Sequence, residues 1–202
     1  MSGNKNINPE ASWAEMIHEF GDAHGPLTPK LSNAFNENPY SLMWHVSWFK
    51  FAGKMIGCKD RTLVFDPLEG LGGWTVACET GKVVAVLPSG DSYEAVRSAW
   101  PDEKIIFEKN SEILMSVENE FGGIVSFDID STRSKEDWNV FFAAAVSVLV
   151  AGGVVVAGGV GSHLSTALKE TAAANFKHVF MFGNGQHHPC ISPVDAVIVV
   201  AC

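Results

Sequence analysis

The sequence predicts a three-layer α/β fold, with a doubly wound, mostly parallel sheet of seven strands whose last strand is antiparallel. Two observations lead to this class. Short runs of consecutive apolar residues alternate with helical patterns, as expected for parallel strands that are buried on both faces. The last two apolar runs have no helical pattern between them, and the polar loop that joins them is long enough for an antiparallel connection.

The individual elements follow from apolar periodicity and from start and stop signals. A helix is predicted over residues 41–56, because Gly57 stands where a helix C′ residue is expected. Another helix begins at Ser134, with Asp137 three positions later as a capping pair. The other helices are expected at residues 73–79, 91–100 and 162–175, and the strands at residues 62–65, 83–87, 104–107, 123–128, 154–157, 179–182 and 196–201.

Residues 141–160 contain only apolar residues, glycine and one serine, a length that also fits a membrane-spanning helix. Gly152 and Gly153 favour a different interpretation, in which a helix ends near residue 151 and a β-branched strand begins. We therefore expect no membrane span.

Two regions are predicted, an irregular N-terminal arm or flap at residues 1–40 and the α/β domain at residues 41–202. Within the arm, residues 13–20 have the spacing of a short amphipathic helix. Glycine and proline residues after position 20 interrupt any helix there.

Composition narrows the partners and the compartment. Hydrophobic residues make up 47% of the chain and charged residues 18%, which indicates a large buried sheet or a surface for a protein partner or a homo-oligomer. The net charge of −9, with no basic run, makes nucleic acid an unexpected partner. The four cysteines are scattered and the N-terminus has no apolar leader, so we expect reduced thiols and a cytoplasmic location.

Residues 62–74, Thr-Leu-Val-Phe-Asp-Pro-Leu-Glu-Gly-Leu-Gly-Gly-Trp, resemble motif I of the class I S-adenosylmethionine-dependent methyltransferases. In that motif, glycines let the backbone approach the ligand, and a helix N-terminus offers N–H groups to the methionine carboxylate. The resemblance assigns cofactor contacts to Asp66, Gly70 and Gly72, with Leu68 in place of the first glycine. A dinucleotide fingerprint would need a third glycine where this chain has threonine, and the Walker A sequence is absent.

The next strand of this family ends in an acid that binds both ribose hydroxyls. Leu87 stands at that position and is followed by Pro88 and Ser89, so the resemblance places the second set of cofactor contacts at Leu87 and Ser89. A leucine forfeits a charge-assisted hydrogen bond, roughly 1.5–3 kcal/mol. Asp91 either compensates for that loss or only caps its helix.

Ser126-Phe-Asp128 resembles the motif IV region, where substrate and methyl group meet, and Asp128 is the candidate catalytic residue. The alternative is that Asp128 is a strand-end or turn residue. The acid of the family's preceding aromatic-acid pair is replaced by Gly122. The closing strands and the aromatic helix before motif I resemble a small bacterial and phage-type branch of the family, so the resemblance covers about residues 38–202.

Other groups have two interpretations each. His187, His188 and Cys190 could ligate a metal, but adjacent histidines usually point apart, so we expect solvated histidines and no metal site. His45 and His163 could act as bases, although nothing in their spacing pairs them with a nucleophile. The aromatic residues of the helix at 41–56 either stack on a ligand or form core.

Two functions from different classes remain. The first is a methyltransferase-fold protein with an eroded cofactor site that serves as a non-catalytic structural or regulatory subunit, binding S-adenosylmethionine weakly or not at all. The second is an active S-adenosylmethionine-dependent methyltransferase that acts on a small-molecule or sugar-like acceptor. We favour the first, because the positions of the family's chemistry match less well than its layout.

Overall fold

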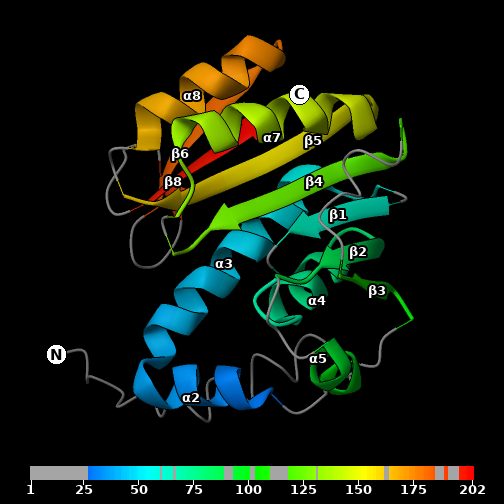
Figure 1. The fold of residues 1–202 in the computed structure, drawn as a ribbon, viewed down its shortest axis with the longest axis vertical. Helices are drawn as coiled ribbons and strands as arrows, with labels where there is room; N and C mark the ends of the chain where they lie inside the picture. Colours follow the sequence, from blue (N-terminus) through cyan, green and yellow to red (C-terminus); the bar gives the residue numbers. More distant parts are fainter. Residues whose placement is uncertain are drawn as a thin grey trace, which may run out of the picture.

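The computed structural model has three layers, a twisted sheet with helices on both of its faces (Figure 1). The residues that it describes are 27–59, 61–65, 67–88, 93–100, 103–109, 118–130, 132–161, 164–184, 189–190 and 196–202.

The sheet has the strand order β3-β2-β1-β4-β5-β8-β6-β7. Strands β1 to β5 are parallel, and β8 runs antiparallel between β5 and β6. The predicted fold class is therefore confirmed, with the two-residue strand β7 as an addition at the edge. The strands are β1 (Arg61–Phe65), β2 (Lys82–Val86), β3 (Ile105–Glu108), β4 (Phe121–Asp128), β5 (Leu149–Val160), β6 (Val179–Asn184), β7 (Pro189–Cys190) and β8 (Ala196–Ala201).

Two apolar clusters, one on each face of the sheet, form the core. Alternate residues of each strand point to opposite faces, so Val83 and Ala85 of β2 belong to one cluster and Val84 and Val86 to the other. All residues of the central strands β4 and β8 are buried. This double burial explains why the strands are runs of consecutive apolar residues.

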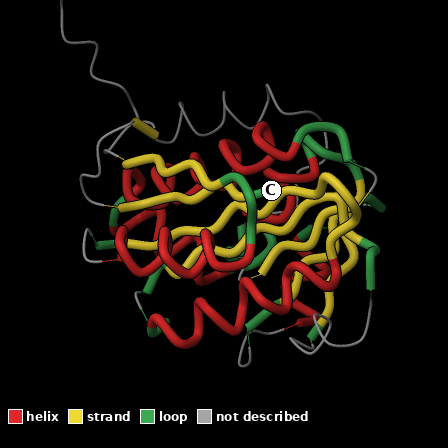
Figure 2. The backbone as a smooth tube through the Cα atoms, turned by 90° about the horizontal axis from the view of Figure 1, so that it is seen from above, coloured by secondary structure: helices red, strands yellow, loops and turns green. Residues whose placement is uncertain are grey.

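The helices divide between the two faces (Figure 2 shows them on both sides of the strands). One face carries α2 (Pro29–Glu37), α3 (Pro39–Ile56), α4 (Leu71–Ala77) and α5 (Tyr93–Ala99), and the other carries α7 (Lys135–Val148) and α8 (Leu164–Asn175). The predicted capping pair is confirmed, since Ser134 and Asp137 form a reciprocal capping box at α7. Gly57, with φ 69°, ends α3.

The prediction of irregular structure before residue 41 is wrong for residues 29–37, which form α2. Thr28 caps this helix by accepting a hydrogen bond from the Leu31 N–H, and a proline occupies the first turn, where its missing N–H costs nothing. Leu31 and Phe35 bury one face of the helix in the core. Pro29 therefore begins a helix at this position and does not interrupt one.

The expected end of the helix near residue 151 is also wrong. α7 ends at Val148, and β5 begins at once with Leu149, which pairs with Phe121 of β4. Gly152 adopts φ 74° inside β5, where the register between the two strands shifts. The glycine pair therefore forms an irregularity within the strand and does not end the helix. No helix among the described residues has the length and hydropathy needed to cross a membrane.

Candidate functional site

A cavity of about 490 Å³ opens at the carboxyl ends of β1, β2 and β4, beneath α2 and α3. Open α/β sheets bind ligands at this edge, and the volume falls within the range of small-molecule sites. Its wall is mixed, with apolar, carboxylate and basic groups. The lining residues are Lys30, Leu31, Ala34, Glu37, Asn38, Ser41, Leu42, His45, Leu68, Glu69, Pro88, Phe127, Asp128, Ile129, Asp130, Thr132 and Arg133.

The loop between β1 and α4 has an unusual backbone. Leu68, Glu69 and Gly70 follow one another with φ values of 51°, 49° and 92°. For the two residues with side chains, this left-handed conformation costs roughly 1–2 kcal/mol each. The loop thus has the left-handed backbone that glycine favours, with a leucine and a glutamate in it. Hydrogen bonds from the Gly70 and Gly72 N–H groups to the Pro67 carbonyl close it.

Glu69 ties this loop to α2. Its carboxylate accepts a hydrogen bond from the Thr28 hydroxyl and lies 3.8 Å from the Lys30 ammonium. The Glu69 side chain is 12% exposed, whereas Lys30 is 73% exposed, so the contact to Thr28 is the protected one. The Trp100 indole N–H donates to the Glu69 carbonyl at 2.8 Å, which fixes the backbone of the same residue.

Gly70 and Gly72, two of the predicted cofactor contacts, are in close contact with aromatic rings. A Cβ on Gly70 would lie 2.3 Å from the Trp100 indole, and a Cβ on Gly72 would lie 2.7 Å from the Phe49 ring. Phe49 is fully buried and packs edge-on against Phe127, so it has no room to move. Neither glycine lines the cavity. Packing between α3, α4 and the segment after α5 accounts for both.

The two described residues that directly follow β2 bring no side-chain acceptor to the cavity. Leu87 is 4% exposed and belongs to the core cluster, so its side chain does not line the cavity. Pro88, the next residue, lines it and offers no side-chain acceptor. The other two predicted cofactor residues, Asp66 and Ser89, lie outside the described part of the chain.

Asp128, the predicted catalytic residue, lines the cavity at the end of β4 with 5% exposure. One of its oxygens accepts from the Thr132 N–H and hydroxyl at 2.9 and 3.1 Å, and the other accepts from the Arg133 N–H at 2.8 Å. Both carboxylate oxygens are thus engaged in holding the turn that follows the strand. This hydrogen bonding is typical of a residue that stabilises a turn, which was the alternative interpretation of Asp128.

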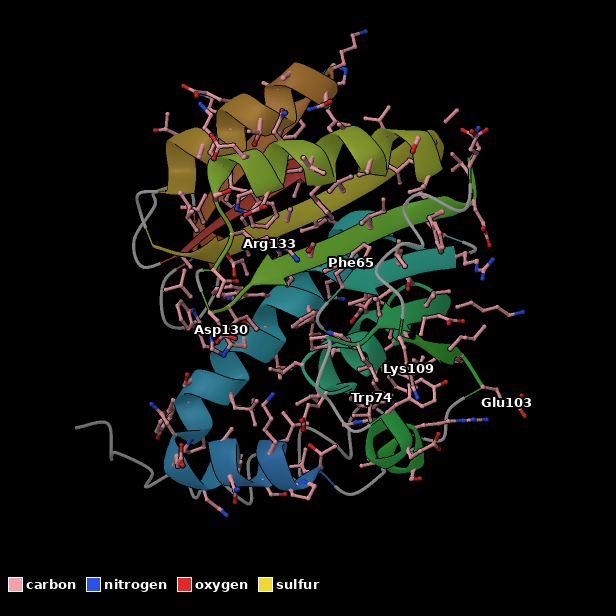
Figure 3. All side chains as sticks on the ribbon, viewed as in Figure 1. Phe65, Trp74, Glu103, Lys109, Asp130 and Arg133 are labelled. Atoms are coloured by element: carbon pink, nitrogen blue, oxygen red, sulfur yellow. The ribbon has the colours of Figure 1, made fainter. Side chains whose placement is uncertain are left out.

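The side chain of Arg133 connects this turn to β4 and α7. Its guanidinium donates to the Ser126 hydroxyl at 2.6 Å and lies over the Trp138 ring at 4.7 Å. Figure 3 shows Arg133 and Asp130 near the end of β4, with Asp130 beside α3. The turn therefore brings both a fixed cation and an exposed carboxylate to the cavity.

His45 reaches the cavity from α3. Burial lowers the pKa of the imidazole, and the negative charge of Asp130 opposes that shift in part. The ring is therefore neutral at pH 7 and can accept or donate a hydrogen bond. Of the aromatic residues of α3, Trp48 and Phe49 are fully buried core, and Trp44 and Phe51 are partly buried against it.

The remaining candidate side chains are not among those that the structure describes. His163, His187 and His188 lie outside the described residues, as does the side chain of Cys190. Across the described segments, no three His, Cys, Asp or Glu side chains are grouped as a metal ion would require.

The comparisons with known proteins give the fold. A methyltransferase titled TehB-like and S-adenosylmethionine-dependent, from Corynebacterium glutamicum, superposes with a TM-score of 0.61 at 12% identity, covering 95% of this chain and 94% of its own. The DhpI–SAH complex gives 0.57 at 12% identity over 78% and 82% of the two chains. This protein has a class I methyltransferase-like fold.

A further methyltransferase, titled SAM-dependent and from Archaeoglobus fulgidus, gives a TM-score of 0.54 at 11% identity over 73% of this chain and 87% of its own. No protein-family model matches the sequence. No curated protein matches it either. At these identities the likeness concerns the fold, and the chemistry must be argued from the chain's own residues.

Two features of the site escaped the sequence interpretation. The role of Glu69 depends on its contact with Thr28, 41 positions earlier in the chain. The role of Trp100 depends on its contact with Glu69, from which it is separated by 31 positions. The contribution of α2 to the cavity wall was hidden because residues 1–40 were treated as one arm. The pattern Thr28-Pro29, a cap residue followed by a proline, was the available signal for a helix start.

Proposed function

We propose that this methyltransferase-fold protein does not transfer a methyl group from S-adenosylmethionine and acts as a structural or regulatory subunit. The observation that carries the proposal is the loop after β1. Where the family's resemblance calls for glycine, Leu68 lines the cavity, and the carboxylate of Glu69 is bound to α2. A ligand that approached the loop backbone would have to displace both side chains.

The other cofactor positions support the same conclusion. The side chain at the ribose-binding position, Leu87, lies in the core, and Pro88 supplies no acceptor in its place. The oxygens of Asp128 are engaged by Thr132 and Arg133, which leaves little capacity to act as a base. The described residues therefore do not fit S-adenosylmethionine in the manner of the family.

A subunit role is supported by apolar side chains that remain on the surface. Val140 and Val146 of α7 are 68% and 45% exposed, and Phe180 of β6 is 56% exposed. A protein partner or a second copy of the chain would cover such residues. Light scattering at micromolar concentration tests this part, and a strict monomer that captures no partner would count against it.

Titration of the purified protein with S-adenosylmethionine by calorimetry tests the cofactor part. We expect a Kd above about 1 mM. The loss of a charge-assisted pair and the crowding by Leu68 together weaken binding at least a hundredfold. A micromolar Kd in the wild-type protein would overturn the proposal.

Two variants sharpen the titration. Leu68→Gly removes the crowding side chain and relieves its backbone strain, so it should increase affinity if this residue is the barrier. Pro88→Asp places a carboxylate on the cavity wall, whereas Leu87→Asp would bury an unpaired charge in the core and destabilise the fold. Leu87→Asp is thus the control, because the resemblance assigns the ribose-binding acid to this position although its side chain lies in the core.

One observation favours the second candidate, an active methyltransferase for a small-molecule or sugar-like acceptor. The cavity brings a neutral His45 close to Asp130, an arrangement that could accept a proton from an acceptor hydroxyl. Micromolar cofactor binding, together with methylation of a hydroxyl acceptor that His45→Gln abolishes, would establish this function in place of the first.

A further inference from the structure

The helix α2 forms the outer wall of the cavity. Its cavity-lining residues are Lys30, Leu31, Ala34 and Glu37, which have the i, i+1, i+4 and i+7 spacing of a single helix face. In Figure 1, α2 lies across the end of α3 that is farthest from the sheet. The helix therefore forms one wall of the cavity, and α3 and the segments after β1, β2 and β4 form the others.

A single residue connects α2 to α3. Asn38, with φ −154° and ψ 86°, lies outside the helical region between the end of α2 at Glu37 and the start of α3 at Pro39. Its side chain caps α3 by accepting from the Ser41 N–H at 3.1 Å. Because this cap is made by Asn38 itself, the first turn of α3 stays satisfied when α2 changes direction. Such element-terminal residues are where hinges form.

A carboxylate holds the other end of α2. Thr28 is the N-cap of the helix and is 4% exposed, and its hydroxyl donates to Glu69 in the loop after β1. Lys30, in the first turn, adds a weaker ion pair to the same carboxylate. The contact lies at the N-terminal end of α2, whereas Asn38 lies at its C-terminal end, so the contact restrains the end that would move farthest in a rotation about Asn38.

The loop that supplies this carboxylate is itself strained. Leu68 and Glu69 are both left-handed, and such residues persist only where their surroundings hold them. The Thr28 hydroxyl and the Trp100 indole are two of the groups that hold Glu69. Losing the contact to Thr28 would therefore weaken the hold on both segments, with α2 then kept in place by Leu31 and Phe35 and the loop by Trp100.

We propose that α2 is a hinged lid that forms one wall of the cavity, with its hinge at Asn38 and its latch at the Glu69–Thr28 contact. With the latch closed α2 narrows the cavity, and release of the latch widens it for a ligand. This proposal does not depend on methyl transfer, because the latch and the hinge are contacts and backbone angles within the protein and involve no cofactor.

Hydrogen exchange of the full-length protein, read by mass spectrometry on peptides, tests the lid without any ligand. Glu69→Met removes the acceptor while keeping a side chain of similar length. We expect the amides of α2 to exchange about fivefold to tenfold faster, with α7 and the central strands unchanged. Glu69→Gln retains an acceptor oxygen and should show a smaller increase.

Glu79→Met is the matched control. Glu79 is a partly buried carboxylate that binds Lys50 and Lys54 at the other end of α3, away from α2. This variant should leave the exchange of α2 unchanged. Equal acceleration of α2 by both variants would mean general loosening of the fold and would overturn the proposal. An unchanged α2 in Glu69→Met, or α2 and α3 accelerated together, would overturn it as well.

Access to the cavity provides a second readout. Leu42→Cys places a thiol at a cavity-lining position of α3 that is only 3% exposed, so a thiol reagent reaches it when α2 moves away. Labelling at position 42, quantified on its own peptide so that native cysteines do not interfere, should rise by the same factor with Glu69→Met. An unchanged labelling rate would show that α2 does not control access.

Discussion

Two loops meet at the carboxyl edge of the sheet, one after β1 and one after β4, and they are stabilised in opposite ways. The loop after β4 is held by its own neighbours, since Asp128 accepts hydrogen bonds from Thr132 and Arg133 within five residues. The loop after β1 is closed by hydrogen bonds to its own Pro67 carbonyl, but Glu69 within it is held by remote groups, Thr28 and Trp100.

This difference separates local from tertiary control of a site. A turn that carries its own acceptor keeps its shape wherever the strand is placed. A loop with two left-handed side chains depends on whatever packs against it. The first loop therefore behaves as a fixed part of the scaffold, while the second can change shape when its remote contacts change.

The largest expected effect tests the local loop. Asp128→Ala removes the charged acceptor of three partly buried hydrogen bonds from Thr132 and Arg133 and should lower the free energy of unfolding by about 2–4 kcal/mol. Urea denaturation followed by circular dichroism measures it. A loss below about 1 kcal/mol would show that the turn does not rely on this carboxylate.

The next effect tests the packing behind the loop after β1. Gly72→Ala places a Cβ 2.7 Å from the buried Phe49 ring, and we expect a loss of about 1–3 kcal/mol from overpacking. Gly57→Ala is an informative contrast, because its Cβ would meet nothing within 4 Å, and only its φ of 69° opposes the substitution. If Gly72→Ala is neutral, α3 and α4 can separate more easily than the structure implies.

The smallest effect is a pH dependence. Burial lowers the pKa of His45 below its unfolded value, so the unfolded chain binds more protons than the folded one between the two pKa values. Stability is therefore full above the unfolded pKa of about 6.5 and is lost as the pH falls through that value toward the folded pKa. Comparison of thermal unfolding at pH 7.5 and 5.5 should show this loss reduced in His45→Gln. An equal loss in both proteins would assign it to other groups.

Much of the fold could be predicted from the sequence because buried strands and capped helices have local signatures. The seven main strands, the capping box at Ser134 and Gly57 at the end of α3 all follow from neighbouring residues. The boundary between α7 and β5 does not follow from neighbouring residues. The pairing of Leu149 with Phe121 starts the strand five residues earlier than predicted. That pairing is tertiary and leaves no mark in the local sequence.

The candidate site was predictable in part. Asp128 and Leu68 were found from the resemblance and do line the cavity. Leu87 was placed at the right strand end, yet the pleat of β2 turns its side chain into the core and leaves Pro88 at the cavity. The contribution of α2 was missed, because a helix of nine residues owes its stability mainly to tertiary packing.

The sequence by itself determined the layered fold. It did so because apolar periodicity and helix caps are properties of neighbouring residues. Only the tertiary structure decided that Glu69 binds Thr28, that Trp100 and Phe49 pack against Gly70 and Gly72, and that α2 forms one wall of the cavity. These contacts join segments far apart in the chain, and their formation depends on how the helices pack against the sheet.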